Sequence, residues 1–362
     1  MVIFLSFLSR ILYLSITYIS SLIFTPYDRS TSLADENNIF EFMLRWDALY
    51  FNEICKNGYY NEHMTAFLPL YPYMVKEISK IFKISCLSAG ILLNNTIFIL
   101  NSIILYKITS KRYNERMAFL SSIFYIFNPA SVIYSSTYSE CIFMFLFLIG
   151  FYFLENRYFF KSFFFFGLCG MCRSNAVLFN VFVFFLNIKY WLGGLLLINI
   201  FFGLVQGYWY LKINPGENII FIPYSYIQKK YWEQGFLRFY TFKKNIPNIF
   251  VGFPFLVFCL IICFRFLKNN FTNILNKSYS NQRMRNTTAL VLILVIQCII
   301  TILFLHWNMF YRFVSYNPFI YWALVSLYEE CKDQMWFLLL MFGYFNFSIL
   351  YCILFGSYYP PA

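Results

Sequence analysis

The chain has 362 residues, of which 60% are hydrophobic, 24% are aromatic and only 12% are charged. A soluble domain carries about twice that share of charged residues, so the composition excludes a soluble globular domain and predicts a polytopic membrane protein. The formal net charge of +12 comes from basic residues that flank apolar segments. Because no Lys/Arg cluster resembles a nucleic-acid-binding arm, we exclude nucleic acid as a partner.

An apolar segment and a large polar loop open the chain. Residues 2–26 are long enough to span roughly 30 Å of hydrocarbon, and we interpret them as a retained anchor because no basic stretch precedes them. The loop 27–86 holds eight of the sixteen acidic residues against six basic ones, so it lacks the basic excess of a cytoplasmic loop. We therefore expect it in a lumen, with amphipathic surface helices over residues 41–54 and 73–82.

A second span is predicted over residues 87–106, and the net charge of +3 on the following KITSKRYNER predicts a cytoplasmic turn. Residues 117–134 and 138–154 then predict a hairpin with the luminal tip NPASVIYSSTYSE. Glu140 enters the second arm of this hairpin. An acid at the mouth of a span is costly unless it is paired or hydrated, which makes Glu140 a functional candidate. An interfacial acid that complements the helix dipole is an equal alternative.

The segment 162–188 is apolar except for Arg173-Ser174-Asn175 at its centre. An arginine at that depth predicts a polar cavity or an anion beside it. The remaining apolar segments bring the total to about ten; they are 190–211, 248–267, 289–307, 313–328 and 335–355.

The two basic loops of this half conflict with a simple topology. Loops 212–247 and 268–287 each carry a net charge of +4, yet one span separates them, so both cannot be cytoplasmic. A break at Arg173-Ser174-Asn175 that turns 162–188 into a re-entrant pair resolves the conflict, if the pair lines a cavity walled by protein. A cytoplasmic loop 268–287 also predicts that its sequons at Asn270, Asn276 and Asn286 carry no glycan.

The ten cysteines fall mostly inside apolar runs, where we expect small hydrophobic side chains and not a disulfide framework. This group includes Cys55, Cys86, Cys141, Cys263 and Cys352. Cys169 and Cys172 have CxxC spacing, but they lie in Phe-rich sequence without a second pair or a nearby histidine, which favours packing over metal binding or redox chemistry. His63 and His306 are the two histidines, so no metal and no cofactor is expected.

Asp47 is the candidate catalytic residue, in the stretch from Arg45 to Pro72. It is one of only four aspartates in the chain, and Arg45 and Trp46 precede it in a segment that can fold on a membrane surface. A carboxylate in that setting can act as a general base. A helix N-cap or a surface charge is the alternative that spacing alone favours.

The motifs argue against a nucleotide substrate. The chain has no Walker loop, no GxGxxG after a strand and no Asp-x-Asp pair. A lipid-linked sugar donor fits better, because its phosphate lies at the membrane surface, where cations can stabilise the leaving group. Candidates for that role are Arg173, Arg312, Lys229, Lys230 and Arg238, although an exposed lysine is more often an ordinary flanking charge.

Six blocks occur in one order along the chain: RWDALYF, NEHMTAFLPLYP, NPASVIYSSTYSE, CRSNAVLFN, IPYSYIQKKYWEQGFLRFY and YRFVSYNPFIYW. Together they resemble the signature blocks of the GPI mannosyltransferase 2 family in the GT-C superfamily. The resemblance implies an all-α polytopic GT-C-like bundle of about eight to ten transmembrane segments, forming a single domain over residues 1–362 in the endoplasmic reticulum membrane. Its active site would face the lumen.

The resemblance also implies the reaction. It would be transfer of the second mannose, in α-1,6 linkage, from dolichyl-phosphate mannose to the mannosyl-glucosaminyl-acyl-phosphatidylinositol precursor. Both substrates are membrane lipids, and an accessory membrane subunit is left open as a further partner. With Asp47 as the base, the substrate-binding residues would be Arg45, Trp46, Glu62, His63, Glu140, Arg173, Asn175, Gln228, Tyr231, Trp232 and Arg312.

Three other functions compete with this one. The nearest is another lipid-phosphate-sugar transferase of the GT-C superfamily with a protein or N-glycan acceptor. A secondary transporter or flippase is a second, because broken helices and membrane arginines also mark transport paths. The chain shows no internal repeat of the kind that transporters carry, and its acidic first loop has no counterpart. A non-catalytic subunit of a transferase complex is the third.

Overall fold

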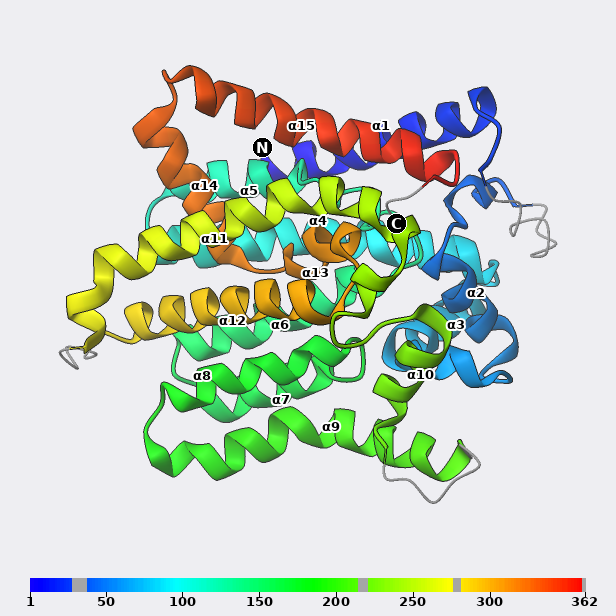
Figure 1. The fold of residues 1–362 in the computed structure, drawn as a ribbon, viewed down its shortest axis with the longest axis horizontal. Helices are drawn as coiled ribbons and strands as arrows, with labels where there is room; N and C mark the ends of the chain where they lie inside the picture. Colours follow the sequence, from blue (N-terminus) through cyan, green and yellow to red (C-terminus); the bar gives the residue numbers. More distant parts are fainter. Residues whose placement is uncertain (28–37, 214–220, 276–280, 360–362) are drawn as a thin grey trace. The chain divides into compact units, whose positions relative to one another are not determined.

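The computed structural model describes residues 1–27, 38–213, 221–275 and 281–359, and within these ranges the chain is helical and contains no strand (Figure 1). This confirms the predicted all-α polytopic fold. Six of the described helices are long and apolar enough to cross a membrane. They are α1 (Val2–Ile23), α4 (Cys86–Arg112), α9 (Trp191–Lys212), α11 (Ile246–Leu275), α12 (Gln282–Phe304) and α15 (Met335–Gly356).

Three expected spans form shorter helices: α5 (Glu115–Ile126), α6 (Glu140–Glu155) and α14 (Pro318–Cys331). The 12 residues of α5 rise only about 18 Å, so the prediction of a span over 117–134 is wrong. The helix ends at Ile126 because Asn128 turns the chain: its side-chain oxygen accepts from the backbone N–H of Ala130 at 2.8 Å. Residues 127–139 are consequently turns rather than helix.

The apolar segment 162–188 breaks where the sequence places its polar cluster. Helix α7 (Phe159–Cys169) ends in a turn, and the chain continues in the 3-10 helix η4 (Ser174–Phe179) and in α8 (Asn180–Phe184). Phe166 packs back on Phe179 at 5.0 Å and on Phe182 at 5.2 Å between ring centroids, so the two arms form a hairpin. The predicted break is present; its re-entrant placement in a membrane stays a prediction.

The chain divides into two compact units, each built from separate stretches of sequence. Unit 1 comprises Met1–Lys56, Tyr73–Phe145 and Tyr311–Ala362, and unit 2 comprises Asn57–Pro72 and Leu146–Phe310. The predicted luminal loop 27–86 therefore contributes to both units. The expectation of a single domain over 1–362 stays a prediction.

In unit 1 the first and last long helices pack side by side (Figure 1). A Cβ atom added to Gly356 would lie 2.4 Å from the carbonyl oxygen of Thr17, so only glycine permits this approach. Ser20 shares a hydrogen bond of 2.8 Å with Ser357. Small residues at such a contact let two apolar helices come close enough for dispersion and hydroxyl hydrogen bonds to hold them.

Arg10 lies within the apolar helix α1 and is 3% exposed. Its guanidinium donates to the carbonyl oxygen of Ser131 at 2.8 Å and to the hydroxyl of Ser135 at 2.9 Å. It also lies over the ring of Phe98, 3.6 Å from the centroid. Because these partners satisfy a charge that lipid would not, Arg10 joins α1 to the turns that precede α6.

Unit 2 holds a layer of closely packed helices, α7, α8 and α9, and the pair α11 and α12 (Figure 1). A Cβ on Gly167 of α7 would lie 2.2 Å from the carbonyl oxygen of Leu197 in α9, so this glycine sets the spacing of the two helices. The polar stretch 268–287, expected as a loop, mostly extends helices: α11 runs to Leu275 and α12 starts at Gln282. The sequon residue Asn276 lies outside the described residues.

Both expected amphipathic helices are present. One is α2 (Asp47–Asn57), preceded by the 3-10 turn η2 (Glu41–Met43). The other is α3 (Leu70–Phe82), which starts before Pro72 and holds this proline in its first turn, where a missing N–H has no cost. The first residue of α2 belongs to the candidate active site of unit 1.

Candidate active site

Two carboxylates and one guanidinium meet in unit 1. Arg312, on the short helix α13 (Phe310–Val314), donates from Nη2 to Asp47 Oδ2 at 2.7 Å and from Nε to Glu140 Oε1 at 2.8 Å. The side chains of Arg312 and Glu140 are 2% and 3% exposed, whereas that of Asp47 is 29% exposed. We call these three residues the acid–arginine cluster. Among them, only the carboxylate of Asp47 is open to a ligand.

The cluster carries a formal charge of −1, because two carboxylates share one cation. Burial alone would lower the pKa of Arg312, but Glu140 and Asp47 outweigh burial and raise that pKa well above its usual value. The guanidinium also lies 4.8 Å from the ring centroid of Tyr138, a favourable cation–π distance. Arg312 is therefore a permanent cation that orients both acids.

Each acid of the cluster is the first residue of a helix: Asp47 starts α2 and Glu140 starts α6. The partial positive charge at a helix N-terminus favours a carboxylate there. Glu140 thus begins a helix, as the dipole alternative drawn from the sequence requires, and it is also paired with a buried arginine; its functional role stays a prediction. For Asp47, its place at a helix start does not exclude a chemical role.

Asparagines on α4 hold the chain that leads into Glu140. Asn94 donates to the carbonyl oxygen of Tyr138 at 2.8 Å, and Asn101 donates to that of Cys141 at 3.0 Å. Both asparagines are fully buried, and they lie seven residues apart on one face of the helix. A long helix of unit 1 thus sets the position at which α6 begins.

Backbone contacts hold the chain that leads into Asp47. The Tyr138 hydroxyl donates to the carbonyl oxygen of Arg45 at 3.0 Å. The Arg45 guanidinium donates to the carbonyl oxygen of Gly356 at 3.2 Å, at the C-terminal end of α15. Trp46 adopts a left-handed backbone with φ of 52°, and its ring lies 5.0 Å from that of Tyr358. Arg45 and Trp46 thus take part in packing, and their expected roles in substrate binding stay predictions.

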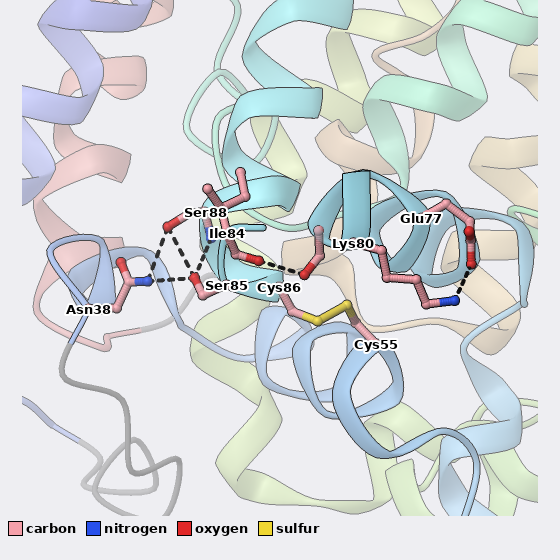
Figure 2. The surroundings of a disulfide bond; sticks show 9 residues. Asn38, Cys55, Glu77, Lys80, Ile84, Ser85, Cys86 and Ser88 are labelled. Carbon is pink, nitrogen blue, oxygen red and sulfur yellow. Dashed lines mark hydrogen bonds and ion pairs between the residues drawn. A yellow bond between two sulfur atoms is a disulfide. The ribbon is translucent and has the colours of Figure 1, made fainter. Parts of the chain in front are cut away.

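A disulfide joins the far end of α2 to the start of α4 (Figure 2). Cys55 and Cys86, 31 residues apart, are bonded, so the prediction that these cysteines are merely small hydrophobic side chains is wrong. The spacing of the cysteines in the sequence could not reveal this pair, because Cys86 is the first residue of a long apolar helix and resembles its other small hydrophobic residues. The other cysteines named from the sequence, Cys141, Cys263 and Cys352, are free and buried as expected.

The start of α4 is itself anchored (Figure 2). Ser85 caps the helix by accepting from the backbone N–H of Ser88 at 3.1 Å, and Asn38 donates to the Ser85 hydroxyl at 2.6 Å. The bond to Cys86 therefore attaches α2 to a fixed point. Because α2 begins with Asp47, the disulfide restrains the helix that carries the exposed carboxylate.

Unit 2 brings together a second set of the expected residues. Lys230 and Tyr231, on α10 (Pro223–Trp232), each donate to Glu62 Oε2 at 2.6 Å. The ring of His63 lies 5.4 Å from that of Tyr231. Burial alone would raise the pKa of Glu62, but the hydrogen bonds from Lys230 and Tyr231 outweigh it and lower that pKa. Burial lowers the pKa of His63.

Glu62 and Lys230 border a cavity of about 880 Å³ in unit 2, which we call the α9 pocket. Its lining combines aromatic, aliphatic and charged side chains: Tyr59, Tyr60, Asn61, Glu62, Thr65, Pro69, Met171, Phe201, Leu204, Val205, Tyr208, Trp209, Lys212, Ile213 and Lys230. An apolar cavity with a few convergent polar groups is the usual form of a small-molecule site. Of the residues expected to bind substrate or the donor phosphate, Glu62 and Lys230 line it.

The remaining expected residues of unit 2 lie outside that lining. Asn175 is buried, and neither its Nδ2 nor its Oδ1 has a hydrogen-bond partner among the described residues. Arg173 and Gln228 are half-buried. Trp232 packs on Phe67 at 5.8 Å between rings, and its carbonyl oxygen contacts His306 Nε2 at 3.2 Å. Trp232 is thus a packing residue of α10, and the binding roles of all four stay predictions.

Sequence reasoning missed Lys212, Tyr208 and Trp209, which line the α9 pocket. They lie at the end of a predicted span, where a lysine and two aromatics are the ordinary composition of a membrane interface. The available signal was their spacing with Phe201, Leu204 and Val205 on one face of a helix. That spacing becomes informative only when a neighbouring element is known to leave the face uncovered.

Comparison with known proteins agrees with this architecture. Two overlapping matches to the mannosyltransferase (PIG-V) family cover residues 1–200 and 195–362. The chain is 24% identical to GPI mannosyltransferase 2 of Drosophila pseudoobscura pseudoobscura over 87% of this chain and 85% of the relative. It is also 24% identical to that of Schizosaccharomyces pombe, over 98% and 83%. For the Saccharomyces cerevisiae protein of the same name the identity is 27%, over 80% and 78%.

Among solved structures, the chain is similar to the oligosaccharyltransferase of Archaeoglobus fulgidus, with a TM-score of 0.53 and 12% identity. The match covers all of this chain and 54% of that structure, so the chain spans about half the length of the solved protein. At this identity the likeness shows the fold alone, and it agrees with the expected GT-C-like helical bundle. Because the family matches together extend over the whole sequence, this multi-pass membrane protein is a glycosyltransferase that belongs to the mannosyltransferase (PIG-V) family.

Proposed function

We propose that the chain transfers the second mannose of the GPI anchor, in α-1,6 linkage, from dolichyl-phosphate mannose to the mannosyl-glucosaminyl-acyl-phosphatidylinositol intermediate. Relatives that match most of its length are named GPI mannosyltransferase 2, which supports the pathway. The observation that carries the chemistry is the carboxylate of Asp47, exposed at one side and fixed by the buried Arg312 at the other.

In the proposed reaction Asp47 accepts the proton of the 6-hydroxyl group on the acceptor mannose. That oxygen forms a bond to the anomeric carbon of the donor, and the bond from this carbon to the phosphate oxygen breaks. Dolichyl phosphate leaves with the bonding electrons. A β-linked donor gives an α-linked product by one inverting displacement, which requires a base but no nucleophilic carboxylate. The phosphate leaves without a proton, so a general acid is not required.

Arg312 and Glu140 act as positioning residues in this scheme. Both are nearly inaccessible, so substrate does not reach them without displacing their contacts. A fixed guanidinium on Asp47 Oδ2 leaves the other carboxylate oxygen for the acceptor hydroxyl. This orientation differs from the expectation that Arg312 holds the donor phosphate, because its guanidinium already pairs with two acids.

We also propose that the active site faces the lumen of the endoplasmic reticulum. The disulfide between Cys55 and Cys86 supports this placement, since disulfides persist in oxidising compartments and are rare in the cytosol. The acidic excess of the loop 27–86 supports it independently. Protection of a cysteine-reactive or protease-sensitive tag inserted near residue 60 in sealed microsomes tests the orientation.

The decisive experiment is complementation of a cell blocked after the first GPI mannose, followed by lipid analysis. Wild-type chain should convert the one-mannose intermediate to the two-mannose lipid. Asp47→Asn should lower turnover at least about 100-fold, with membrane expression retained. Asp333→Asn, which removes an exposed aspartate far along the sequence, is the matched control and should leave turnover unchanged. Full activity of Asp47→Asn removes the base assignment, and a failure of wild-type chain to extend the lipid removes the function.

A further inference from the structure

We propose that the α9 pocket binds the polyprenyl-phosphate sugar donor, with Lys212 and Lys230 at the phosphate and the face of α9 along the isoprenoid chain. The inference rests on the proposed function for the identity of the donor. It assigns a binding role to Lys212 and to a helix face that no sequence motif singled out.

Helix α9 supplies six of the fifteen lining residues, more than any other helix. Phe201, Leu204, Val205, Tyr208 and Lys212 follow the spacing i, i+3, i+4, i+7, i+11, which places them in a single row. The row extends over about 16 Å of helix. It is apolar at Phe201 and Leu204 and charged at Lys212, so it has the polarity of a lipid that ends in an anionic head group.

This row is open at Leu204 and Tyr208, whereas Phe201 packs on Phe164 at 5.8 Å between ring centroids and Val205 packs on a buried cluster that includes Ile227. Leu204 is 66% exposed and Tyr208 is 55% exposed, in a helix of which only 17% of the membrane-spanning window is buried. The segment around the 3-10 helix η3 (Glu62–Ala66) adds the polar lining residues Asn61, Glu62 and Thr65. A ligand in the pocket thus meets both an apolar helix and hydrogen-bonding groups.

The charges of the lining favour an anion. Lys212 and Lys230 contribute two positive charges and Glu62 one negative charge, which leaves a surplus of one cation. Glu62 accepts from Lys230 at 2.6 Å, whereas the described residues place no carboxylate against Lys212. Lys212 is exposed, and its ammonium group lies 5.9 Å from the centroid of Tyr208. It can therefore turn to a phosphate without breaking an ion pair.

Both lipid substrates of the proposed reaction carry a phosphate, and the shape of the row distinguishes them. One row of side chains on a single helix offers a track for one unbranched chain. The donor has one isoprenoid chain directly attached to its phosphate, whereas the acceptor has paired chains on a glycerol with an inositol on the phosphate. We therefore assign the pocket to the donor, and binding of the acceptor is the competing outcome.

The test uses the purified full chain in lipid nanodiscs. Dolichyl phosphate is titrated against wild-type chain and against Lys212→Gln, with Leu204→Trp to fill the track. Lys189→Gln is the matched control, because it removes an exposed lysine just before the other end of α9 and outside the lining. Loss of a charged hydrogen bond predicts about tenfold weaker binding for Lys212→Gln. Leu204→Trp should also weaken binding, and Lys189→Gln should match wild type.

The competition arm uses phosphatidylinositol. Dolichyl phosphate is first bound to the wild-type chain, and an excess of either lipid is then added. The assignment is supported if added dolichyl phosphate displaces the bound lipid and phosphatidylinositol does not. It is overturned if phosphatidylinositol displaces the bound lipid equally well or better. Unchanged affinities in Lys212→Gln and Leu204→Trp also overturn it. Failure of this assignment can be told apart from failure of the proposed function. A wild-type chain that does not extend the GPI intermediate refutes the proposed reaction. Normal dolichyl phosphate binding and normal turnover in Lys212→Gln and Leu204→Trp refute only the role of the pocket. Lys212 and Leu204 are exposed, so neither substitution removes a core contact.

Discussion

The acid–arginine cluster of unit 1 and the Lys230–Glu62 pair of unit 2 are both ion pairs with atoms less than 3 Å apart, but their surroundings differ. Arg312 is 2% exposed beside a Glu140 that is 3% exposed, whereas Lys230 and Glu62 are 44% and 26% exposed. Breaking a buried pair leaves a charge without compensation, while water replaces either partner of an exposed pair. Although the contact distances are similar, the difference in burial therefore predicts a rigid ion pair at the proposed chemical centre and an adaptable one at the proposed binding pocket.

Replacement of Arg312 should have the largest effect. Arg312→Met leaves Asp47 and Glu140 without their cation, and removal of one partner from a buried pair costs about 3–5 kcal/mol. We expect a large drop in melting temperature and loss of turnover, measured by differential scanning fluorimetry and lipid analysis. Arg312→Lys keeps the charge but not the two-sided geometry, so it should recover stability better than activity. Normal stability of Arg312→Met would contradict the buried pairing.

Replacement of Glu140 sharpens the comparison within the cluster. Glu140→Gln removes one of two negative charges and keeps a side-chain oxygen for Arg312. Loss of a charged hydrogen bond should cost about 1.5–3 kcal/mol, with turnover reduced through altered orientation of Asp47. Steady-state kinetics separate the roles: kcat should fall in Glu140→Gln while the KM values stay close to wild type, because Glu140 acts through the cluster. Lower stability with unchanged kcat would leave Glu140 with a purely structural role.

Removal of the disulfide should have an intermediate effect. Cys55→Ser and Cys86→Ser should each lower the free energy of unfolding by about 2–4 kcal/mol, and the double variant should lose no more than either single variant. Alkylation with and without reductant, followed by mass spectrometry, measures the bond directly. Cys352→Ser is the control, because that cysteine is free. A fully alkylated wild-type Cys55 before reduction would refute the pairing.

The smallest effect is expected at the exposed pair. Lys230→Met should cost less than about 1 kcal/mol of stability. The pKa of Glu62 is lowered from its usual 4.5, so the pair stabilises the fold above that pH and loses this contribution as the pH falls through the lowered pKa. The difference in melting temperature between wild type and Glu62→Gln should accordingly be constant from pH 6 to 8 and vanish in more acidic buffer. If Lys230→Met or Glu62→Gln lowered the melting temperature as much as Arg312→Met does, the proposed difference between the buried and the exposed ion pair would be wrong.

The helices and the individual site residues could be predicted from the sequence, but the contacts between these residues could not. Hydropathy predicts the long helices well, because twenty apolar residues have few alternatives in a membrane. The break of the segment 162–188 was predictable because Arg173 and Asn175 cannot lie in lipid cheaply. Asp47, Glu140 and Arg312 were each singled out as isolated residues, but nothing in their spacing showed that one guanidinium holds both acids across 265 and 172 residues of sequence.

What the sequence could not supply is tertiary in origin. The bond from Cys55 to Cys86 depends on where α2 meets α4. The packing of Arg45 depends on the end of α15, where the carbonyl oxygen of Gly356 accepts two of its hydrogen bonds. The α9 pocket exists because the helix face at Leu204 and Tyr208 lacks a covering neighbour. The disulfide, the packing contact and the pocket each depend on how two elements meet, whereas a local sequence pattern describes a single element.

The distance along the chain between Arg312 and its acids has a consequence for biogenesis. A ribosome that has made the helices beginning at Asp47 and Glu140 has not yet made their counter-charge, and the partner of α1 in unit 1, α15, comes later still. Two acids and the face of α1 that packs on α15 therefore remain without their partners until the last sixth of the polypeptide is made. A nonsense mutation shortly before codon 312 would spare both acidic groups of the proposed catalytic centre and still yield a protein for the quality-control machinery to degrade.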